Sequence, residues 1–117
     1  MTSPRSLPGS RRLKSKKEID EIFKQGRYAK LGWLQAKFSP GRETKSRFMV
    51  SVRKAVGNAP ERNRIRRVVK EAIRLHQDEL SGGYDVCFFI THRSKEPVRL
   101  STVESEIQKF FNDLSKR

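Results

Sequence analysis

The chain has 117 residues, enough for one domain with a modest hydrophobic core. Lys and Arg number 27 against 13 Asp and Glu, which gives a net charge of +14. Such an excess repels itself in a folded protein, so it argues against a merely solubilising surface and predicts a polyanionic partner, most commonly nucleic acid.

The first predicted helix follows a polar, proline-containing segment. Residues 1–12 are expected to form a flexible basic tail, and residues 13–117 a single domain. Ser15 and Glu18 have the spacing of a helix capping box, which predicts a helix over about residues 15–25. The apolar face of this helix comprises Ile19, Ile22 and Phe23.

Alternation of period two then predicts two strands. In the first, over residues 27–38, one side carries Leu34, Ala36 and Phe38, and the other Trp33, Gln35 and Lys37. In the second, over about residues 46–53, one side carries Phe48, Val50 and Val52, and the other Met49, Ser51 and Arg53. Two antiparallel strands with one polar face each predict a sheet that helices cover on one side only.

The longest predicted helix runs over about residues 59–80, with Asn58 and Glu61 as its capping pair. Its apolar stripe comprises Ile65, Val68, Val69, Ala72, Ile73 and Leu80, with His76 inside it. A continuous apolar run predicts a buried strand over residues 84–90. A last helix is expected over about residues 101–115, and this order of elements predicts a small α+β sandwich.

Three further expectations concern the cap of the last helix, the single cysteine and the compartment. Ser101 and Glu104 have capping-box spacing at the start of the last helix. Cys87 is the only cysteine, so no intramolecular disulfide can form, and its apolar surroundings predict a small core residue. No stretch approaches the about 18 apolar residues of a membrane span, so a cytoplasmic protein without a membrane partner is expected.

Positive charge concentrates in the first half of the long helix. At about 100° per residue, Asn63, Arg66, Arg67, Lys70 and Arg74 lie opposite the apolar stripe, and Arg62 and Arg64 lie on its flanks. Like charges are unfavourable where the helix dipole is also positive, but a bound phosphate would reverse that balance. The alternative is that these charges form an ordinary solvent-exposed helix face. Such faces mix positive and negative charges, however, and only Glu61 and Glu71 interrupt the positive charges of this helix.

The same region resembles a known family, the bacterial ribonuclease P protein component. The similarity lies in Glu61-Arg62-Asn63-Arg64-Ile65-Arg66-Arg67, preceded by Val52-Arg53-Lys54 and Gly57-Asn58. Matching features elsewhere are Arg12-Leu13-Lys14 before a short helix with Phe23, and Gly83-Tyr84-Asp85 before the last strand. The resemblance covers roughly residues 11–114.

The resemblance implies a two-layer α/β sandwich with a left-handed β-α-β crossover, similar to a ribosomal-protein domain. It implies a subunit of an RNA-catalysed endoribonuclease that removes the 5′ leader of precursor tRNA, as a heterodimer of one protein and one RNA. The ribonuclease P RNA is expected to contact Arg53, Lys54, Asn58, Arg62, Asn63, Arg64, Arg66, Arg67 and Lys70. The leader is expected to bind Ile19, Phe23, Trp33, Gln35, Lys37, Ser51 and Arg53.

One departure from the family concerns the leader site. The family often has aromatic side chains at the position of Ile19 and near Lys37, so leader contact here is expected to depend more on Phe23, Trp33 and charge. Each stacked base contributes about 1–3 kcal/mol.

No catalytic residue and no metal ligand is predicted in the protein itself. His76 and His92 have no evident partner in the sequence, and the acidic residues are dispersed. The resemblance implies that Mg²⁺ serves the RNA subunit and that the protein alone binds no cofactor. The alternative is a ribosomal or other structural RNA-binding protein without a processing role. A DNA-binding module would need a helix-turn-helix, and a stand-alone nuclease would need catalytic groups of its own.

Overall fold

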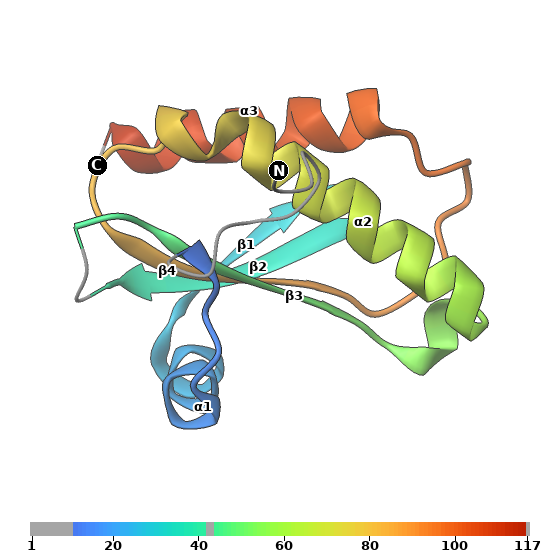
Figure 1. Ribbon diagram of the computed structural model, residues 1–117, viewed down its shortest axis with the longest axis horizontal. Helices are drawn as coiled ribbons and strands as arrows, with labels where there is room; N and C mark the ends of the chain where they lie inside the picture. Colours follow the sequence, from blue (N-terminus) through green and yellow to red (C-terminus); the bar gives the residue numbers. More distant parts are fainter. Residues whose placement is uncertain (1–10, 42–43, 117) are drawn as a thin grey trace, which may run out of the picture.

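A mixed four-stranded sheet forms the centre of the computed structural model, which describes residues 11–41 and 44–116 (Figure 1). Its strands are β1 (Arg27–Leu31), β2 (Leu34–Pro40), β3 (Arg47–Val52) and β4 (Tyr84–Ile90). They lie side by side in the order β1-β2-β4-β3, and β4 pairs antiparallel with β2 and parallel with β3. The predicted strands β2 and β3 are therefore antiparallel in direction but are separated by β4.

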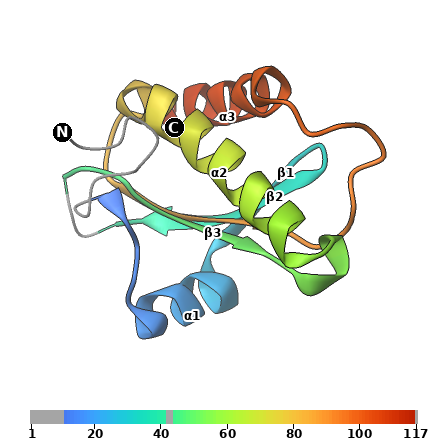
Figure 2. The ribbon, with the colours of Figure 1, turned by 45° about the vertical axis from the view of Figure 1, so that its right-hand side comes forward.

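Three helices cover the two faces of the sheet unequally (Figure 2). Helices α2 (Ala59–His76) and α3 (Leu100–Ser115) lie on one face, and the short α1 (Lys16–Gln25) lies on the other. A 3₁₀ turn precedes α2 at Lys54–Val56, and another follows it at Gln77–Glu79. The connection β3–α2–β4 joins two neighbouring parallel strands by a left-handed crossover. Together, the mixed sheet and the helices packed on it form the α+β sandwich expected above.

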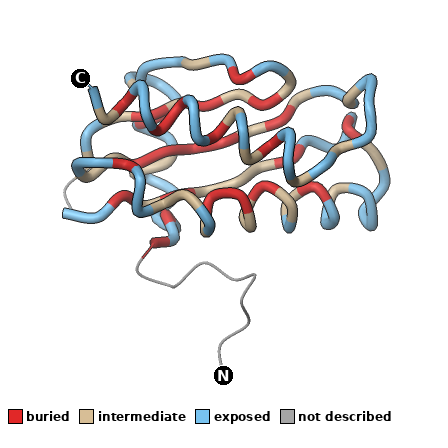
Figure 3. The backbone as a smooth tube through the Cα atoms, turned by 90° about the horizontal axis from the view of Figure 1, so that it is seen from above, coloured by how far each residue is buried: buried red, intermediate tan, exposed pale blue. Residues whose placement is uncertain are grey.

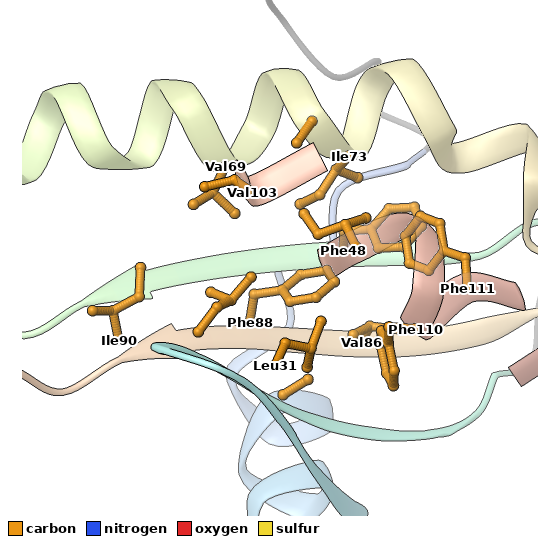
Figure 4. Close-up of a cluster of buried hydrophobic side chains, with 14 of the residues drawn as sticks. Leu31, Phe48, Val69, Ile73, Val86, Phe88, Ile90, Val103, Phe110 and Phe111 are labelled. Atoms are coloured by element: carbon orange, nitrogen blue, oxygen red, sulfur yellow. The ribbon is translucent and has the colours of Figure 1, made fainter. Parts of the chain in front are cut away.

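The main core lies between the sheet and the pair α2 and α3 (Figure 4). Every second strand residue points into it, and the buried ones are Leu31, Leu34, Ala36, Phe38, Phe48, Val52, Val86, Phe88 and Ile90. The helices contribute Ile65, Val69, Ala72, Ile73, Val103, Ile107, Phe110, Phe111 and Leu114. Buried positions recur along both helices in Figure 3, as expected for amphipathic helices that each bury one stripe.

The predicted strand over residues 27–38 is wrong, because the chain forms a hairpin there. Leu31 pairs with Leu34, so Gly32 and Trp33 make a two-residue turn between β1 and β2. Gly32 has a φ of 64°, which only glycine adopts at little cost. The period-two alternation over β2 is nevertheless confirmed, since Leu34, Ala36 and Phe38 are all buried on the side of the main core.

A second, smaller cluster attaches α1 to the opposite face of the sheet. Leu13, Ile22 and Cys87 are buried there, with Ile19 and Met49 packed against them. Desolvation by burial, helped by the charge of Asp85, raises the pKa of Cys87 to about 12, which fits the predicted core role.

An ion-pair network also holds α1 to the sheet. Arg47 donates to both carboxylate oxygens of Asp85, at 3.1 and 2.9 Å, and to Glu18 of α1 at 2.7 Å. Asp85 is buried, and its hydrogen bonds, followed by that of Glu18, raise the pKa of Arg47. Loss of one member would leave a buried charge uncompensated, so this network fixes the position of α1 over the sheet.

The helix boundaries confirm most of the predicted caps. Ser15 accepts a hydrogen bond from the Glu18 N–H, and Asn58 accepts one from the Glu61 N–H. The long helix ends at His76, four residues earlier than predicted, although Leu80 is still buried in the main core. The predicted capping box at the start of the last helix is wrong, because Arg99 occupies the cap position and makes no side-chain cap bond.

The folded domain includes the last two residues of the predicted tail. Arg11 is buried and donates to the Ser46 carbonyl at 3.3 Å and to Asp78 at 2.8 Å, and Arg12 forms a bridge with Phe48 of β3. These long-range contacts carry no local sequence signal. The rest of the predicted tail, residues 1–10, lies outside the described residues.

The end of α2 is held to α3 by a histidine between two carboxylates. His76 contacts Glu79 through Nδ1 and Glu104 of α3 through Nε2, the latter at 2.8 Å. Gln108 donates to Glu79 at 3.1 Å. Burial lowers the pKa of His76, but the hydrogen bonds to Glu79 and Glu104 outweigh burial and raise it. The expectation that His76 lacks a partner is therefore wrong, because its partners come from other turns of the chain.

This cluster predicts a pH-dependent contribution to stability. Since the pKa of His76 is raised in the folded state, protonated His76 stabilises the fold below its unfolded pKa of about 6.5 and loses that effect as the pH rises through the folded pKa. His76→Gln is therefore expected to lower the free energy of unfolding more at about pH 6 than at about pH 9, as measured by urea denaturation. The exposed His92→Gln is the matched control. An equal loss at both pH values would contradict the prediction.

Candidate RNA interface

The first half of α2 carries a group of five cations on successive turns of one helix. Asn58 caps the helix by accepting the Glu61 N–H at 3.0 Å, and Ile65 and Val69 bury its apolar stripe against the main core. The cations on the remaining sides of the helix therefore point away from the core. Together with Asn63 they form the α2 basic face: Arg62, Asn63, Arg64, Arg66, Arg67 and Lys70.

The charge of the α2 basic face is not neutralised within residues 11–41 and 44–116. Arg66 donates to the Asn63 amide oxygen and Arg64 donates to the Val98 carbonyl at 2.8 Å, so their partners are neutral. The two carboxylates nearby are used elsewhere: Glu61 lies 3.8 Å from Arg93, and Glu71 pairs with Arg74 at 2.7 Å. Five cations thus keep their full charge on one helix end, as phosphate binding requires.

Two hollows open on this face, and cationic side chains line both of them. Asn63, Arg66, Arg67 and Lys70 line one of about 570 Å³, together with Pro60. The other, of about 430 Å³, is lined by Arg64, Arg67, Val68, Glu71 and Leu100. Arg67 belongs to both hollows, so a sugar–phosphate backbone could run from one to the other along a continuous row of guanidinium groups.

The remaining residues predicted for this interface differ in their surroundings. Arg53 follows β3 and Lys54 begins the 3₁₀ turn, and both are exposed beside the start of α2. Arg62 is half-buried, and its Nε is shielded from solvent and has no hydrogen-bond partner among the residues that the structure describes. The side-chain oxygen of Asn58 is engaged as the helix cap, so Asn58 positions the α2 basic face through the helix rather than by a free amide oxygen.

A second candidate surface is the part of the sheet that faces away from α2 and α3, beside α1. Strand register places Gln35, Phe89 and Ser51 in one row across β2, β4 and β3, and Lys37, Cys87 and Met49 in the next. The three predicted strand residues Gln35, Lys37 and Ser51 thus share this face, and all three are partly exposed. This surface is called the open sheet face below.

Aromatic rings border the open sheet face. Phe23 of α1 is 37% exposed, and its ring centroid lies 5.3 Å from that of Phe89. Tyr28 of β1 is 52% exposed, with its ring 6.5 Å from Phe89 and its hydroxyl donating to Gln35 at 3.0 Å. Gln35 in turn donates to Thr91 at 3.0 Å. Three rings with polar groups between them can stack on bases and bind their edges.

Sequence reasoning missed Tyr28 and Phe89 on this face. Phe89 could have been assigned from period two, because Val86, Phe88 and Ile90 point into the main core and the alternate residues of β4 must point away. Tyr28 gave no such signal, since the predicted strand ran through the hairpin turn and no face was assigned to its first residues.

Two predicted leader residues occupy other positions. Trp33 lies in the β1–β2 turn and not on a strand; it packs against the main core, and its Nε1 donates to the His92 carbonyl at 2.7 Å. Its placement in the alternating row was wrong because the turn reverses the chain there. Ile19 packs against the small cluster under α1, so most of its side chain serves to attach α1 to the sheet and little of it is available to contact a leader.

Groups for acid–base or metal chemistry do not converge on either surface. Within the described ranges, no three His, Cys, Asp or Glu side chains lie together in a way that could hold a metal ion. Cys87 is buried under α1, and His76 is engaged by two carboxylates. Among the same residues, no helix has the length and apolar character needed to cross a membrane. What the arrangement offers is charge and stacking surface, which is the chemistry of RNA binding.

Known proteins share both the sequence pattern and the fold. A family model described as Ribonuclease P matches residues 7–115. The ribonuclease P protein component of Clostridioides difficile is 34% identical over 106 residues, which cover 90% of this chain and 89% of that protein. The RNase P protein of Thermotoga maritima superposes with a TM-score of 0.74 at 25% identity, covering 91% of this chain and 96% of that one. The RNase P protein of Staphylococcus aureus superposes with a TM-score of 0.75 at 20% identity, covering 91% of this chain and 95% of that one.

The crowding of like charges on α2 predicts an unusual stability effect. Arg66 has Arg62 and Lys70 four residues before and after it, and each such like-charged pair destabilises a helix by about 0.2–0.5 kcal/mol. In the absence of RNA, Arg66→Gln is expected to raise the free energy of unfolding at low salt by a comparable amount, and the gain should shrink at high salt. Urea denaturation at two salt concentrations measures this. A clear loss of stability would show that Arg66 has a structural role.

Proposed function

The chain belongs to the ribonuclease P protein component family, the protein subunits of the ribonucleoprotein that processes the 5′ ends of tRNA, and we propose that its two surfaces divide the binding of RNA. Its partner is the ribonuclease P RNA. In the proposal, the α2 basic face binds that RNA and the open sheet face binds the 5′ leader of precursor tRNA. Family membership favours this processing role over that of a structural ribosomal protein.

The observation that carries the proposal is the unneutralised charge of the α2 basic face. Phosphates that seat on Arg62, Arg64, Arg66, Arg67 and Lys70 would release condensed counterions, and this release supplies much of the affinity for a polyanion. The phosphates would also remove the mutual repulsion of these cations at the start of a helix. Structured RNA suits a rigid helix face, since double-stranded RNA is recognised mainly by shape and backbone.

The open sheet face suits a single strand better than a duplex. Phe23, Tyr28 and Phe89 offer ring surface, which stacks on unpaired bases with little regard to sequence. Lys37 and Arg53 add positive charge for the backbone, and Gln35 and Ser51 can bind base edges. The precursor tRNA leader is a single-stranded segment of this kind, so we assign it to this face.

Hydrolysis of the phosphodiester is assigned to the RNA, with Mg²⁺ held by the RNA. The described part of the protein brings together no ligand set that fits a metal ion. The protein's contribution would be to reduce the repulsion between two polyanions and to guide the leader, so that the scissile bond reaches the RNA active site. We further propose one protein per RNA and a cytoplasmic location, where tRNA precursors are processed.

Arg67→Gln tests the α2 basic face. Removal of one phosphate contact should weaken binding to ribonuclease P RNA and lower the slope of log affinity against log salt by about one. The matched control is Arg74→Gln, on the same helix but already paired with Glu71, which should change the slope less. Fluorescence anisotropy over a salt series gives both values. An unchanged affinity and slope for Arg67→Gln would overturn the assignment of this face.

Phe23→Ala tests the open sheet face. In the assembled ribonucleoprotein, loss of one stacking ring should weaken binding of precursor tRNA by about 1–3 kcal/mol and leave mature tRNA, which has no leader, nearly unaffected. Leu75→Ala is the control, since Leu75 is a similarly exposed apolar residue on α2, at 44% exposure. Equal losses for precursor and mature tRNA would remove the leader from this face.

A further inference from the structure

A third cation-rich surface lies beyond the end of β4, where residues 91–99 pass the β1–β2 turn. A hollow of about 440 Å³ opens there, with Trp33, Pro97 and Val98 among its lining residues. Four cations also line it, Lys30, Arg93, Lys95 and Arg99, against a single carboxylate, that of Glu96. This surface, called the loop surface below, comprises the hollow and these four cations.

Specific contacts hold the loop in place. Trp33 donates to the His92 carbonyl at 2.7 Å, and Ser94 donates to the Glu96 carbonyl at 2.7 Å. From the other side, Arg64 of α2 donates to the Val98 carbonyl at 2.8 Å. The loop is therefore tied to both the hairpin turn and α2, so its cations are presented on an ordered backbone and less ordering entropy would be lost on binding.

Its positive charge is largely free. No ion pair involves Lys30, Lys95 or Arg99 within the described ranges, and Arg93 has only a long contact of 3.8 Å to the exposed Glu61. The first turn of α3 adds to the potential, because it contains no acidic residue and Arg99 makes no side-chain cap bond. Like charges gathered without partners are unfavourable in the free protein, and a polyanion would neutralise them.

The loop surface continues the α2 basic face. The hollow lined by Arg64 and Arg67 includes Leu100, the residue that follows Arg99. Arg64 thus contributes to one hollow and anchors the wall of the other. The open sheet face, by contrast, lies on the side of the sheet that carries α1, away from the core side against which Trp33 packs.

We propose that the loop surface is a second docking site for the ribonuclease P RNA, with backbone phosphates seated over Lys95 and Arg99 next to the Trp33 ring. The inference rests on the proposed function, because the same RNA would extend from the α2 basic face onto the loop. A rigid site continuous with a duplex-binding helix fits structured RNA, whereas the flexible leader is assigned to the opposite face of the sheet.

Paired charge substitutions test this site. Lys95→Ala with Arg99→Ala should weaken RNA binding several-fold and lower the salt slope by about one to two. The matched control removes two exposed cations from the far end of α3, Lys109→Ala with Lys116→Ala, and should change the slope much less. Equal effects of the two double variants would overturn the loop surface. If Arg67→Gln also left binding unchanged, the proposed function itself would fail.

Trp33 provides a second readout in the unmodified protein, because it is the only tryptophan in the chain. Acrylamide quenching of its fluorescence should fall at least twofold when ribonuclease P RNA is bound, since the RNA would cover the hollow. Anisotropy of labelled RNA in the same sample verifies that the complex has formed. Unchanged quenching in a formed complex would refute the loop surface while leaving the α2 basic face intact. If an acidic protein but not RNA protected Trp33 from acrylamide quenching, RNA would equally be rejected as the occupant of the loop surface.

Discussion

The pairing of β4 with β2 on one side and β3 on the other positions both proposed RNA-binding surfaces. Val86, Phe88 and Ile90 of β4 fill the main core, while Cys87 and Phe89 point to the other face, where Cys87 is buried under α1 and Phe89 stays partly exposed beside Phe23. Because β3 and β4 are parallel, the chain must cross over the sheet between them, and α2 is that crossover. The start of α2 therefore projects at the edge where β3 ends, with its stripe buried and its cations outward (Figure 1).

The elements were predictable where the signal was local. Periodicity identified α1, α2 and β3 because amphipathic burial acts within a single helix or strand, and a continuous apolar run identified β4. The hairpin at Gly32 was missed because Trp33 continued the alternation across the turn, which hid the reversal of the chain. The insertion of β4 between β2 and β3, and the contact of His76 with Glu104 of α3, are products of long-range packing, on which local sequence carries no information.

The same distinction applies to the functional surfaces. The α2 basic face could be derived from the sequence because all its members lie on one helix, and the structure adds that no carboxylate neutralises them within the described ranges. The open sheet face combines residues of α1 and four strands, so only part of it was predicted: Gln35, Lys37 and Ser51 were placed by alternation, Phe89 was overlooked although the same alternation applies to it, and Tyr28 gave no signal. Trp33 was misplaced for the same reason as the hairpin, and its true neighbours define the loop surface.

An uncompensated charge that persists in the folded protein is the central physical claim, and the salt dependence of wild-type binding to ribonuclease P RNA tests it most directly. Each phosphate seated on a cation contributes about 0.7–0.9 to the slope of log affinity against log salt. Engagement of the five cations of the α2 basic face therefore predicts a slope of at least about 3.5 in magnitude. A slope near zero, with tight binding retained at high salt, would show that another kind of contact holds the RNA and would contradict the account.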